Sequence, residues 1–498
     1  MVVKTKTKNI SESDKDIVNK VRKLIKFRKN DIPKLRYAMI HTLFGYSDGV
    51  SIVMKQIEGV LVEELKVPQN NIMYLVGKSK FRSPRVTQRE ILLHRNYANK
   101  LMLRHFSDGY GGWYNQIIEE ALSKAQKEIE NFISSHNIDV LIAHNSSHPE
   151  NFVSSVALSR YYRDAERQGK KTPKYILWWH DSHLERPRFE KPAKDVWRYL
   201  LEGVPGLYVE YILFINSMQF SQSQRYFLEL DKYKNGFFDC MHLNHDVIYN
   251  TTDTFIQTYD DLVTEKVDER TIQFLHDFNI LDTLKEKGQS LDDVLFCLQH
   301  TRVVHRKRID FALKFSFELL AKLKKKNKFK SLYFFVSGHS AENGVAKRKI
   351  KRLYSSLCKE YGHKDLILGF AEQNKKTKIK FEEYPRIFAK LGGFSTYFSE
   401  IEGFGNNLLE VMASGLIPVL YTYPVFLKDI AKYHFKAICL SEFKIDPKSI
   451  DLTMDILTND RKRKIWVNRN LDILRTKFSH RIIARKLQRA IIRRRIHL

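Results

Sequence analysis

Short hydrophobic runs recur along the first half of the chain, separated by polar turns and by stretches with helical spacing. The first run begins at Leu35 and is followed by the turn GYSDG and by the amphipathic stretch SIVMKQIEGVLVEEL. Further runs occupy 138–145, 174–181 and 211–217. Strands that alternate with helices are typical of a parallel sheet with crossover helices. We therefore predict an α/β domain over 35–245, preceded by a polar extension over 1–34.

The same alternation begins again near residue 294. DVLFCLQ precedes a long helical pattern, IDFALKFSFELLAKL, and the candidate strands SLYFFVSG, DLILGF, GGFSTYFS and IPVLYTY follow. We predict a second α/β domain over 294–440, with a linker or insertion over 246–293. The fold class is then α/β, with two Rossmann-like, doubly wound domains. Because open parallel sheets bind ligands at the carboxyl ends of their strands, we expect a ligand cleft between the domains.

The end of the chain, 441–498, is predicted to be helical and basic. From Arg461 onward, 38 residues include 14 Lys or Arg and one Asp. Hydrophobic residues from Leu471 to Ile491 recur at spacings of three and four, which is typical of amphipathic helices. We expect these helices to pack back across the domains, and contact of their basic face with an anionic membrane surface stays open.

Composition narrows the kinds of partner. The 498 residues include 85 Lys or Arg and 57 Asp or Glu, a formal charge of +28, so anionic ligands are expected. A hydrophobic content of 43% excludes a disordered chain. The four cysteines are scattered, and neither a secretory leader nor a membrane-spanning apolar run is legible. We expect a cytoplasmic protein, with association at the cytoplasmic face of a membrane left open.

The segment from Glu402 to Glu410 carries the strongest chemical signal. Gly403 and Gly405 let the backbone approach a ligand closely, and the following helix directs amide donors and its positive end toward that ligand. Asn406 is the expected N-cap of this helix. The carboxylates of Glu402 and Glu410 can accept hydrogen bonds from hydroxyl groups. The segment therefore predicts a site for a polyhydroxylated, phosphorylated molecule.

This segment, EGFGNNLLE followed by VMASGLIPV, resembles the signature of the family 4 glycosyltransferases, which are retaining enzymes of GT-B architecture. The resemblance implies that Glu410 holds the ribose hydroxyls of a nucleotide sugar and that Glu402 lies beside the donor sugar. It also implies a donor-binding loop formed by Gly403, Phe404, Gly405, Asn406, Asn407 and Leu408. The alternative is a helix N-terminus whose acidic residues only complement the helix dipole.

A second resemblance follows the predicted strand DVLFCLQ. Arg302 and Lys307 match an arginine and a lysine of the family, although Thr301 and Arg308 stand where glycines are usual. Cleavage of the glycosidic bond leaves new negative charge on a nucleoside diphosphate, which fixed cations stabilise. We therefore expect Arg302 and Lys307 to stabilise the leaving group, and Arg306 could share this role. A solvated, basic helix start is the alternative interpretation.

The first domain contributes fewer expected site residues. Gly49, in the loop after the first strand, resembles a residue of the family's glycine loop and is expected to line the cleft. His180 follows a predicted strand and resembles a histidine that approaches the donor sugar or the reacting centre. Asp181 and His183 are assigned to the acceptor side. A structural role for His180 is an equally open interpretation.

The resemblance implies transfer of a hexosyl group from a nucleotide-diphosphate sugar to an acceptor hydroxyl with retained configuration. No metal or other cofactor is expected, because the one DxD sequence lies at 14–16 in the polar extension and Arg302 and Lys307 supply positive charge. The acceptor stays open among a small acid, a polysaccharide and a lipid-linked molecule.

Two other classes of function fit part of the sequence pattern. A GT-B relative such as a sugar-nucleotide epimerase or a phosphorylase would bind the same donor, and product analysis with and without acceptor separates these activities. A nucleic-acid-binding protein is suggested by the net charge. However, no zinc-finger, RRM or KH signature is legible, so no specific nucleic acid partner is expected.

Overall fold

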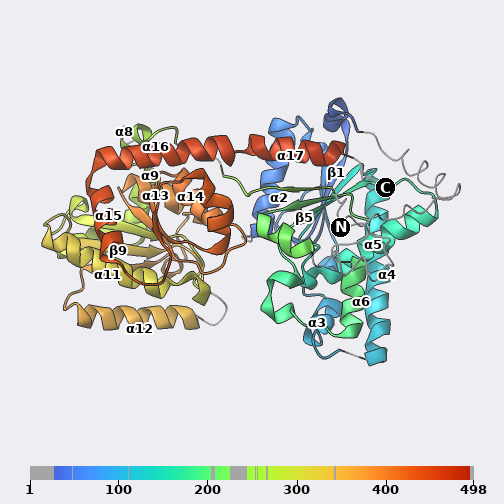
Figure 1. Cartoon of the computed structure of the whole chain (residues 1–498), viewed down its shortest axis with the longest axis horizontal. Coiled ribbons are helices and arrows are strands. Elements are labelled where there is room, and N and C mark those ends of the chain that lie inside the picture. Colours follow the sequence, from blue (N-terminus) through green and yellow to red (C-terminus); the bar gives the residue numbers. More distant parts are fainter. Residues whose placement is uncertain are drawn as a thin grey trace, which may run out of the picture. The chain divides into compact units, whose positions relative to one another are not determined.

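The computed structural model of the chain describes residues 27–46, 49–109, 111–203, 208–224, 244–252, 254, 256–264, 267–340 and 344–493, without the side chains of 111–113, 184 and 187. The chain divides into two compact units (Figure 1). The first comprises Met1–Tyr249 and His480–Leu498, and the second comprises Asn250–Ser479. Both are α/β units with parallel sheets, which confirms the predicted fold class.

The first unit is built on a seven-stranded sheet in the order β3-β2-β1-β4-β5-β6-β7. Its strands are β1 Tyr37–Phe44, β2 Ile72–Ser79, β3 Val86–Gln88, β4 Val140–His144, β5 Lys174–Trp179, β6 Tyr211–Phe214 and β7 His245–Val247. Strands β1, β4, β5 and β6 coincide with the hydrophobic runs and are almost entirely buried. The strand order reverses between β1 and β4, which is the switch point where open parallel sheets bind ligands.

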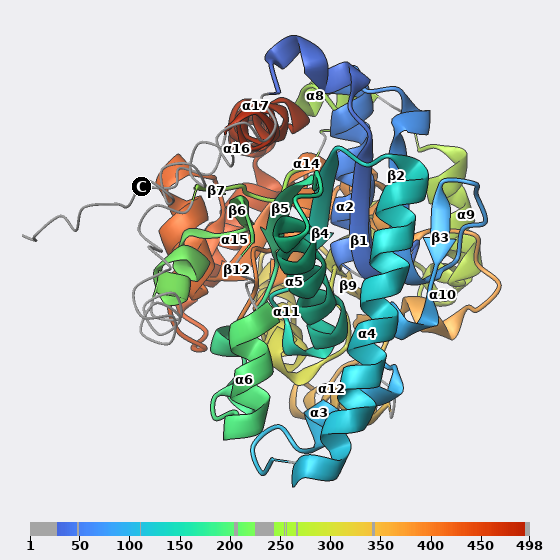
Figure 2. The ribbon, with the colours of Figure 1, turned by 90° about the vertical axis from the view of Figure 1, so that its right-hand side faces the viewer.

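Helices cover both faces of this sheet (Figure 2). They are α2 Gly49–Gly59 with a π-helical extension Val60–Glu64, α3 Tyr97–Arg104, α4 Gly111–His136, α5 Phe152–Arg167, α6 Lys194–Gly203 and α17 His480–Ile492. Ala38 and Ile40 of β1 belong to a core with residues of α4, α5 and α6. Tyr37 and Met39 belong to another core with residues of α2 and α17. Alternate residues of β1 thus serve opposite cores, because strand side chains alternate in direction.

The second unit contains a six-stranded parallel sheet in the order β10-β9-β8-β11-β12-β13. Its strands are β8 Val294–Gln299, β9 Ser331–Val336, β10 Leu366–Phe370, β11 Phe394–Tyr397, β12 Pro418–Tyr421 and β13 Ile438–Leu440. Its helices are α8 Tyr259–Thr264, α9 Glu269–Asp277, α10 Ile280–Glu286, α11 Ile309–Lys325, α12 Val345–Glu360, α13 Tyr384–Lys390, α14 Asn406–Ala413, α15 Pro447–Thr458 and α16 Asp460–Lys477. The switch point of this Rossmann-type order lies between β8 and β11.

The stretch 246–293, which we expected to be a linker or insertion, is divided between the two units. Strand β7 extends the first sheet, whereas α8, α9 and α10 belong to the second unit. The fully buried Phe274 of α9 explains this, because its ring lies 5.2 Å from the rings of both Phe335 and Phe388. Aromatic packing therefore builds these helices into the second core.

From Asp460 onward, the described part of the chain forms two helices, α16 and α17, that belong to different units. Helix α16 lies in the second unit, and α17 lies in the first, beginning after a break at Phe478 and Ser479. Leu487 and Ile491 of α17 are fully buried in the core that contains α2. The hydrophobic stripe of α17 is thus buried in the core of the first unit.

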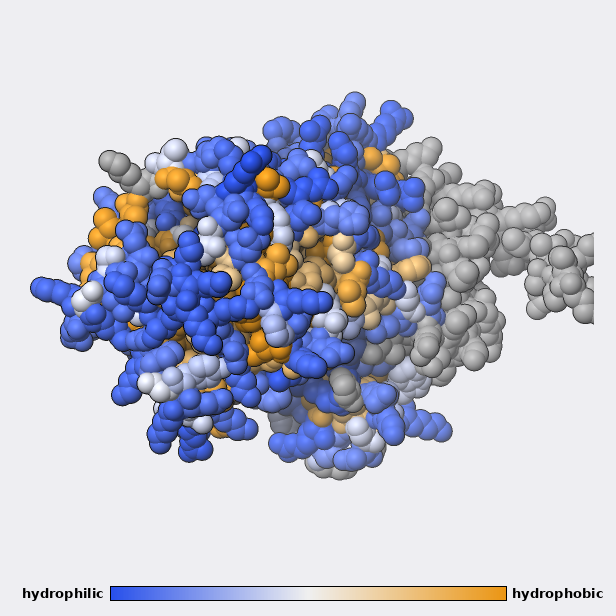
Figure 3. Space-filling view, turned by 60° about the vertical axis from the view of Figure 1, so that its left-hand side comes forward, coloured by the Kyte–Doolittle hydropathy of each residue, from blue (hydrophilic) through white to orange (hydrophobic). Residues whose placement is uncertain are grey.

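The surface of the second unit includes a strongly basic helix, α12. Helix α12 exposes Arg348, Lys349, Lys351 and Arg352. The surface of this unit in Figure 3 is correspondingly dominated by hydrophilic residues, with hydrophobic residues in small groups. Within the described ranges, no helix combines the length and the hydrophobicity needed to cross a membrane.

Candidate active site

The predicted donor residues gather at the switch point of the second sheet. Strands β8 and β11 are neighbours, with Phe394 opposite Cys297 and Ser395 opposite Leu298. The segment after β8 therefore runs beside the segment after β11, and Glu400 N donates to the Arg306 carbonyl at 2.9 Å. The pairing of β8 with β11 thus brings the segment with Arg302 and Lys307 next to the segment that begins at Glu402.

Glu402 and Lys307 form an ion pair at the centre of this site. The Glu402 side chain is 10% exposed and that of Lys307 is 7% exposed. Tyr397 Oη donates to Glu402 Oε1 at 2.8 Å, and an Arg306 guanidinium nitrogen lies 3.4 Å from Oε2. Burial alone would raise the pKa of Glu402, but the charges of Lys307 and Arg306 outweigh it and lower this pKa. The carboxylate is therefore ionised at neutral pH.

Arg302 lies in a different environment from Lys307. It is exposed, and it forms no ion pair with any residue that the structure describes. Its exposed guanidinium leaves it available to an anionic ligand. Arg308, at the position of a family glycine, adopts a left-handed conformation with φ 44° between the 3₁₀ turn His305–Lys307 and α11. This backbone conformation is uncommon for a residue other than glycine, and the Arg308 guanidinium forms an ion pair with Glu400 at 3.0 Å.

Gly405 lets the loop before α14 pack closely against Tyr423. Its φ is 114°, and a Cβ at this position would overlap the hydroxyl of Tyr423. That hydroxyl donates to the carbonyl of Phe404 at 2.8 Å. Gly405, rather than Asn406, is the N-cap of α14, so the expected capping role of Asn406 is wrong. Asn406 is the first helical residue instead, and its side-chain oxygen accepts from Asn250 Nδ2 at 2.6 Å.

The remaining donor-loop residues divide into buried and accessible side chains. Phe404 and Leu408 are buried in the core, so only their backbone could face a ligand. Gly403 is exposed. Asn407 is partly buried, and its Nδ2 donates to the His300 carbonyl at 2.6 Å.

Glu410 lies on the second turn of α14, with its side chain 23% exposed. Its Oε2 atom is 3.1 Å from Nε2 of His300. His300, Tyr397 and Tyr423 also belong to this site, although no motif in the sequence pointed to them. For His300, the available signal was its position directly after a buried strand and two residues before Arg302.

In the first unit, His180 joins a group of histidines at the switch point of the sheet. His144 Nδ1 lies 3.2 Å from His180 Nε2, and His41 Nδ1 donates to the His144 carbonyl at 3.1 Å. Burial, with a smaller contribution from His41, lowers the pKa of His180 to about 3. His180 is therefore a neutral imidazole at physiological pH.

The loop after β5 holds the other predicted residues of the first unit. Asp181 accepts from Arg186 Nε at 2.7 Å, and burial outweighs this contact and raises the pKa of Asp181. His183 is 3% exposed and its ring meets that of Trp197 edge-on at 5.7 Å. Burial, and to a smaller extent His148, lowers the pKa of His183 to about 4. Gly49 is the exposed first residue of α2 and does not contact this group.

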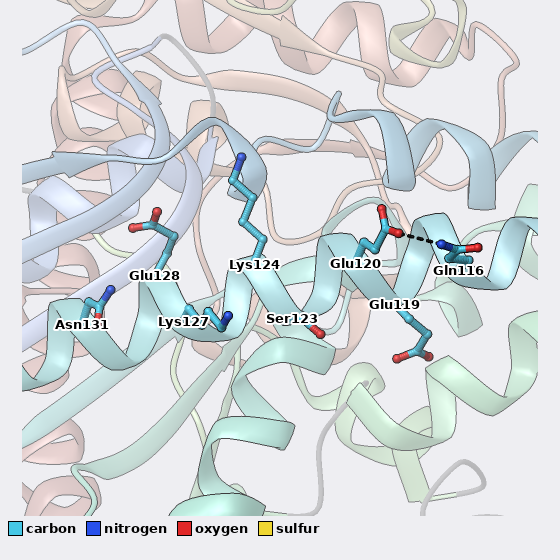
Figure 4. Close-up of a pocket in the computed structure, with 8 residues that line it drawn as sticks. All are labelled: Gln116, Glu119, Glu120, Ser123, Lys124, Lys127, Glu128 and Asn131. Carbon is cyan, nitrogen blue, oxygen red and sulfur yellow. Dashed lines mark hydrogen bonds between the residues drawn. The ribbon is translucent and has the colours of Figure 1, made fainter.

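A shallow hollow on α4 is unrelated to these residues (Figure 4). Its lining side chains are Gln116, Glu119, Glu120, Ser123, Lys124, Lys127, Glu128 and Asn131. All belong to one helix, so polar groups from different elements do not converge there as they do in ligand sites. Among the described residues, no three His, Cys, Asp or Glu side chains gather in a way that could hold a metal ion.

Two curated proteins are similar to this chain over most of its length, whereas no family model matches it. Mannosylglucosylglycerate synthase of Petrotoga mobilis is 26% identical over 426 residues, which cover 82% of this chain and 86% of the relative. Mannosylglucosylglycerate synthase of Thermotoga maritima is 22% identical over 424 residues, covering 82% and 85%.

Solved glycosyltransferase structures share the fold. WaaG, a glycosyltransferase involved in lipopolysaccharide biosynthesis, matches with a TM-score of 0.52 and 12% identity, covering 91% of this chain and 99% of its own. HepE of Anabaena, solved with UDP and glucose, matches with a TM-score of 0.52 and 12% identity, covering 92% and 99%. The curated relatives and these structures together show that the chain is a glycosyltransferase with the GT-B fold, and its EGFGNNLLE segment resembles the family 4 signature.

Proposed function

We propose that this glycosyltransferase moves a hexosyl group from a nucleotide-diphosphate sugar to an acceptor hydroxyl with retained configuration and without a metal ion. The proposal rests on the group formed by Lys307, Glu402 and Arg306 at the switch point of the second sheet. Glu410 lies on α14, the helix that follows the loop containing Glu402. This group combines cations for a diphosphate with carboxylates for sugar hydroxyls.

On the donor side, the residues have separate tasks. Glu410 accepts hydrogen bonds from the ribose hydroxyls, and Glu402 lies beside the transferred sugar. Lys307 and the exposed Arg302 stabilise the charge that develops on the leaving diphosphate. This placement supports a reaction in which fixed cations take the part that a divalent metal has in other nucleotide-sugar enzymes.

Retention follows if the acceptor hydroxyl attacks from the face that the diphosphate leaves. A departing phosphate oxygen then takes the hydroxyl proton, and no protein nucleophile is needed. His180 would approach the reacting centre as a neutral imidazole, because its pKa of about 3 excludes a role as a protonated acid at neutral pH.

The acceptor we propose is a small acidic glycoside. The two curated relatives are both named mannosylglucosylglycerate synthase, which supports mannosyl transfer to glucosylglycerate. In the first unit, the loop after β5 carries the exposed Arg186 and Arg188, which form ion pairs with Asp181 and Glu150. Guanidinium groups bind carboxylates well, so this loop suits the glycerate end of such an acceptor.

Donor and acceptor can be tested in turn. Thermal unfolding with GDP-mannose, UDP-glucose or UDP-N-acetylglucosamine identifies the donor, since only a bound ligand raises the melting temperature. Transfer to glucosylglycerate is then followed by mass spectrometry with and without EDTA, and NMR gives the anomeric configuration. We expect a retained, EDTA-insensitive product. Donor conversion without acceptor, phosphorolysis, or an inverted product would contradict the proposal.

The assignment of the residues needs its own test. We expect Glu410→Ala to raise the donor Kd, and Arg302→Ala to lower kcat more than it changes donor binding. Lys314→Ala, an exposed position on α11, is the matched control for loss of a positive charge. Unchanged kinetics in the Glu410 and Arg302 variants would refute the assignment.

A further inference from the structure

We propose that His300 is a positioning residue that orients the Glu410 carboxylate toward the donor; this inference rests on the function proposed above. His300 directly follows β8, and its side chain is fully buried. Its Nε2 lies 3.1 Å from Glu410 Oε2, although 110 positions separate the two residues. The contact joins the end of the central strand β8 to α14.

The direction of this hydrogen bond follows from the chemistry of the two groups. An ionised carboxylate can only accept, so His300 Nε2–H donates to Glu410. The other ring nitrogen, Nδ1, lies 2.9 Å from the hydroxyl of Ser337, which follows β9. In the neutral ring this hydroxyl donates to Nδ1. Both nitrogens are thus engaged, which fixes the orientation of the imidazole.

Two further contacts hold His300 in place. The ring of Phe381 stacks on the imidazole, with 4.0 Å between centroids and an angle of 17° between planes. Asn407 Nδ2 donates to the His300 carbonyl at 2.6 Å. His300 therefore contacts both Asn407 on the first turn of α14 and Glu410 on its second turn. These two contacts fix the position of the Glu410 carboxylate relative to the end of β8.

The contact also decides which part of Glu410 faces a ligand. Among the residues that the structure describes, His300 is the one side chain that hydrogen-bonds to the Glu410 carboxylate. One carboxylate oxygen is thus anchored while the side chain remains 23% exposed, so Oε1 is left to accept from a hydroxyl group. A carboxylate that is already oriented loses less conformational entropy when the donor binds.

Paired substitutions separate this role from a general structural one. His300→Gln keeps an N–H donor near the position of Nε2, whereas His300→Asn keeps one near Nδ1 and loses the contact with Glu410. Kd is measured by calorimetry for GDP and for UDP, and KM and kcat are measured with the matching nucleotide sugar. Ser337→Ala is a third variant, which removes the other anchor of the ring.

We expect His300→Asn to raise the Kd of the nucleotide and the donor KM about 10- to 100-fold, as for loss of a hydrogen bond to a charged group. His300→Gln should stay within about threefold of the wild type, since it restores the donor. The acceptor KM and the kcat at saturating donor should change little. Equal effects of the Asn and Gln variants on donor affinity would overturn the proposal.

The Glu410→Ala background distinguishes failure of this inference from failure of the proposed function. In that background His300→Asn should have no further effect on donor affinity, because the partner is absent. If Glu410→Ala itself leaves nucleotide binding unchanged, the proposed donor site is wrong. If Glu410→Ala weakens binding while His300→Asn has the same effect in both backgrounds, only the positioning role is wrong. If His300→Asn does not fold, Ser337→Ala tests the positioning role instead. A rise in donor Kd, smaller than that expected for His300→Asn, would support the role, and an unchanged donor Kd would contradict it.

Discussion

The carboxylate of Glu402 is paired with the ammonium of Lys307, which lies 95 positions earlier in the chain. The pair is almost fully buried, and both residues come from segments that resemble family 4 glycosyltransferases. A buried pair of this kind has two consequences, one for folding and one for the reaction, because Lys307 both neutralises Glu402 and supplies charge to the site.

Replacing Lys307 should separate these two consequences. Lys307→Ala leaves Glu402 with Arg306, Tyr397 and Ser399 as partners but without its closest cation. This change should lower the free energy of unfolding by about 3 kcal/mol, and kcat should fall about 100-fold or more. Adding Glu402→Gln removes the uncompensated charge and should restore much of the stability but not the turnover. Urea unfolding and steady-state kinetics measure the two effects, with Lys314→Ala as control. Recovery of kcat in the double variant would show that Lys307 acts only structurally.

Glu185 should make the stability of the first unit depend on pH. Its carboxyl accepts from Trp179, Ser182 and Gln219 at 2.8–3.1 Å, and burial together with Asp181 raises its pKa from 4.5 to about 7. The folded state then binds more protons than the unfolded state between these values. The free energy of unfolding should therefore fall as pH rises from about 4.5 to about 7.

The measurement is a difference between variants, since neighbouring histidines also titrate. Relative to Glu185→Gln, the wild type should lose up to about 3 kcal/mol of stability across this interval. Glu190→Gln, at an exposed position of the same region, should show the wild-type dependence. A constant difference between wild type and Glu185→Gln at all pH values would contradict the raised pKa.

Gly405→Ala should damage the donor loop. The added Cβ would meet the Tyr423 hydroxyl at a φ of 114°, so we expect a loss of about 2–3 kcal/mol and weaker donor binding. Gly288→Ala is the control, because its φ of 62° is also left-handed but no atom lies within 4 Å of the added Cβ. It should cost about 1 kcal/mol. In a Tyr423→Phe background the cost of Gly405→Ala should decrease, and an unchanged cost would mean that the hydroxyl is not the obstacle.

Leu487→Ala should destabilise the first unit although the residue lies near the end of the chain. Leu487 is fully buried in the core that also contains Ile57 and Val60, so the expected loss is about 2–5 kcal/mol. Arg485→Ala, on the exposed face of the same helix, should change stability by less than about 0.5 kcal/mol. Urea unfolding followed by the fluorescence of the buried Trp178 and Trp179 reports on this unit. Equal stability of the two variants would refute the packing of α17.

Much of the fold was legible in the sequence, because buried parallel strands leave continuous hydrophobic runs. β1, β4, β5, β6 and β8 to β12 all coincide with such runs. β3, β7 and β13 have three residues each, which is too short for a pattern. Asn406 was expected to cap α14, but Gly405 occupies that position because the chain enters the helix in a left-handed conformation that favours glycine.

The site was predicted as two separate segments rather than as a set of contacts. The sequence places Glu402 and Lys307 in different elements, and only the adjacency of β8 and β11 brings them together. For His300 the sequence offered only its position directly after a buried strand, and a single histidine at such a position has many structural uses. Its relation to Glu410 depends on the same strand order, which hydrophobic patterning alone does not determine.

Helix α17 completes the core of the first unit, yet it is encoded after the whole of the second. During translation, the surface of the first unit that α17 covers therefore remains exposed until more than two hundred further residues have been synthesised. The second unit is contiguous and can close its core earlier. The first unit can therefore complete its core only after the second unit and α17 have been synthesised.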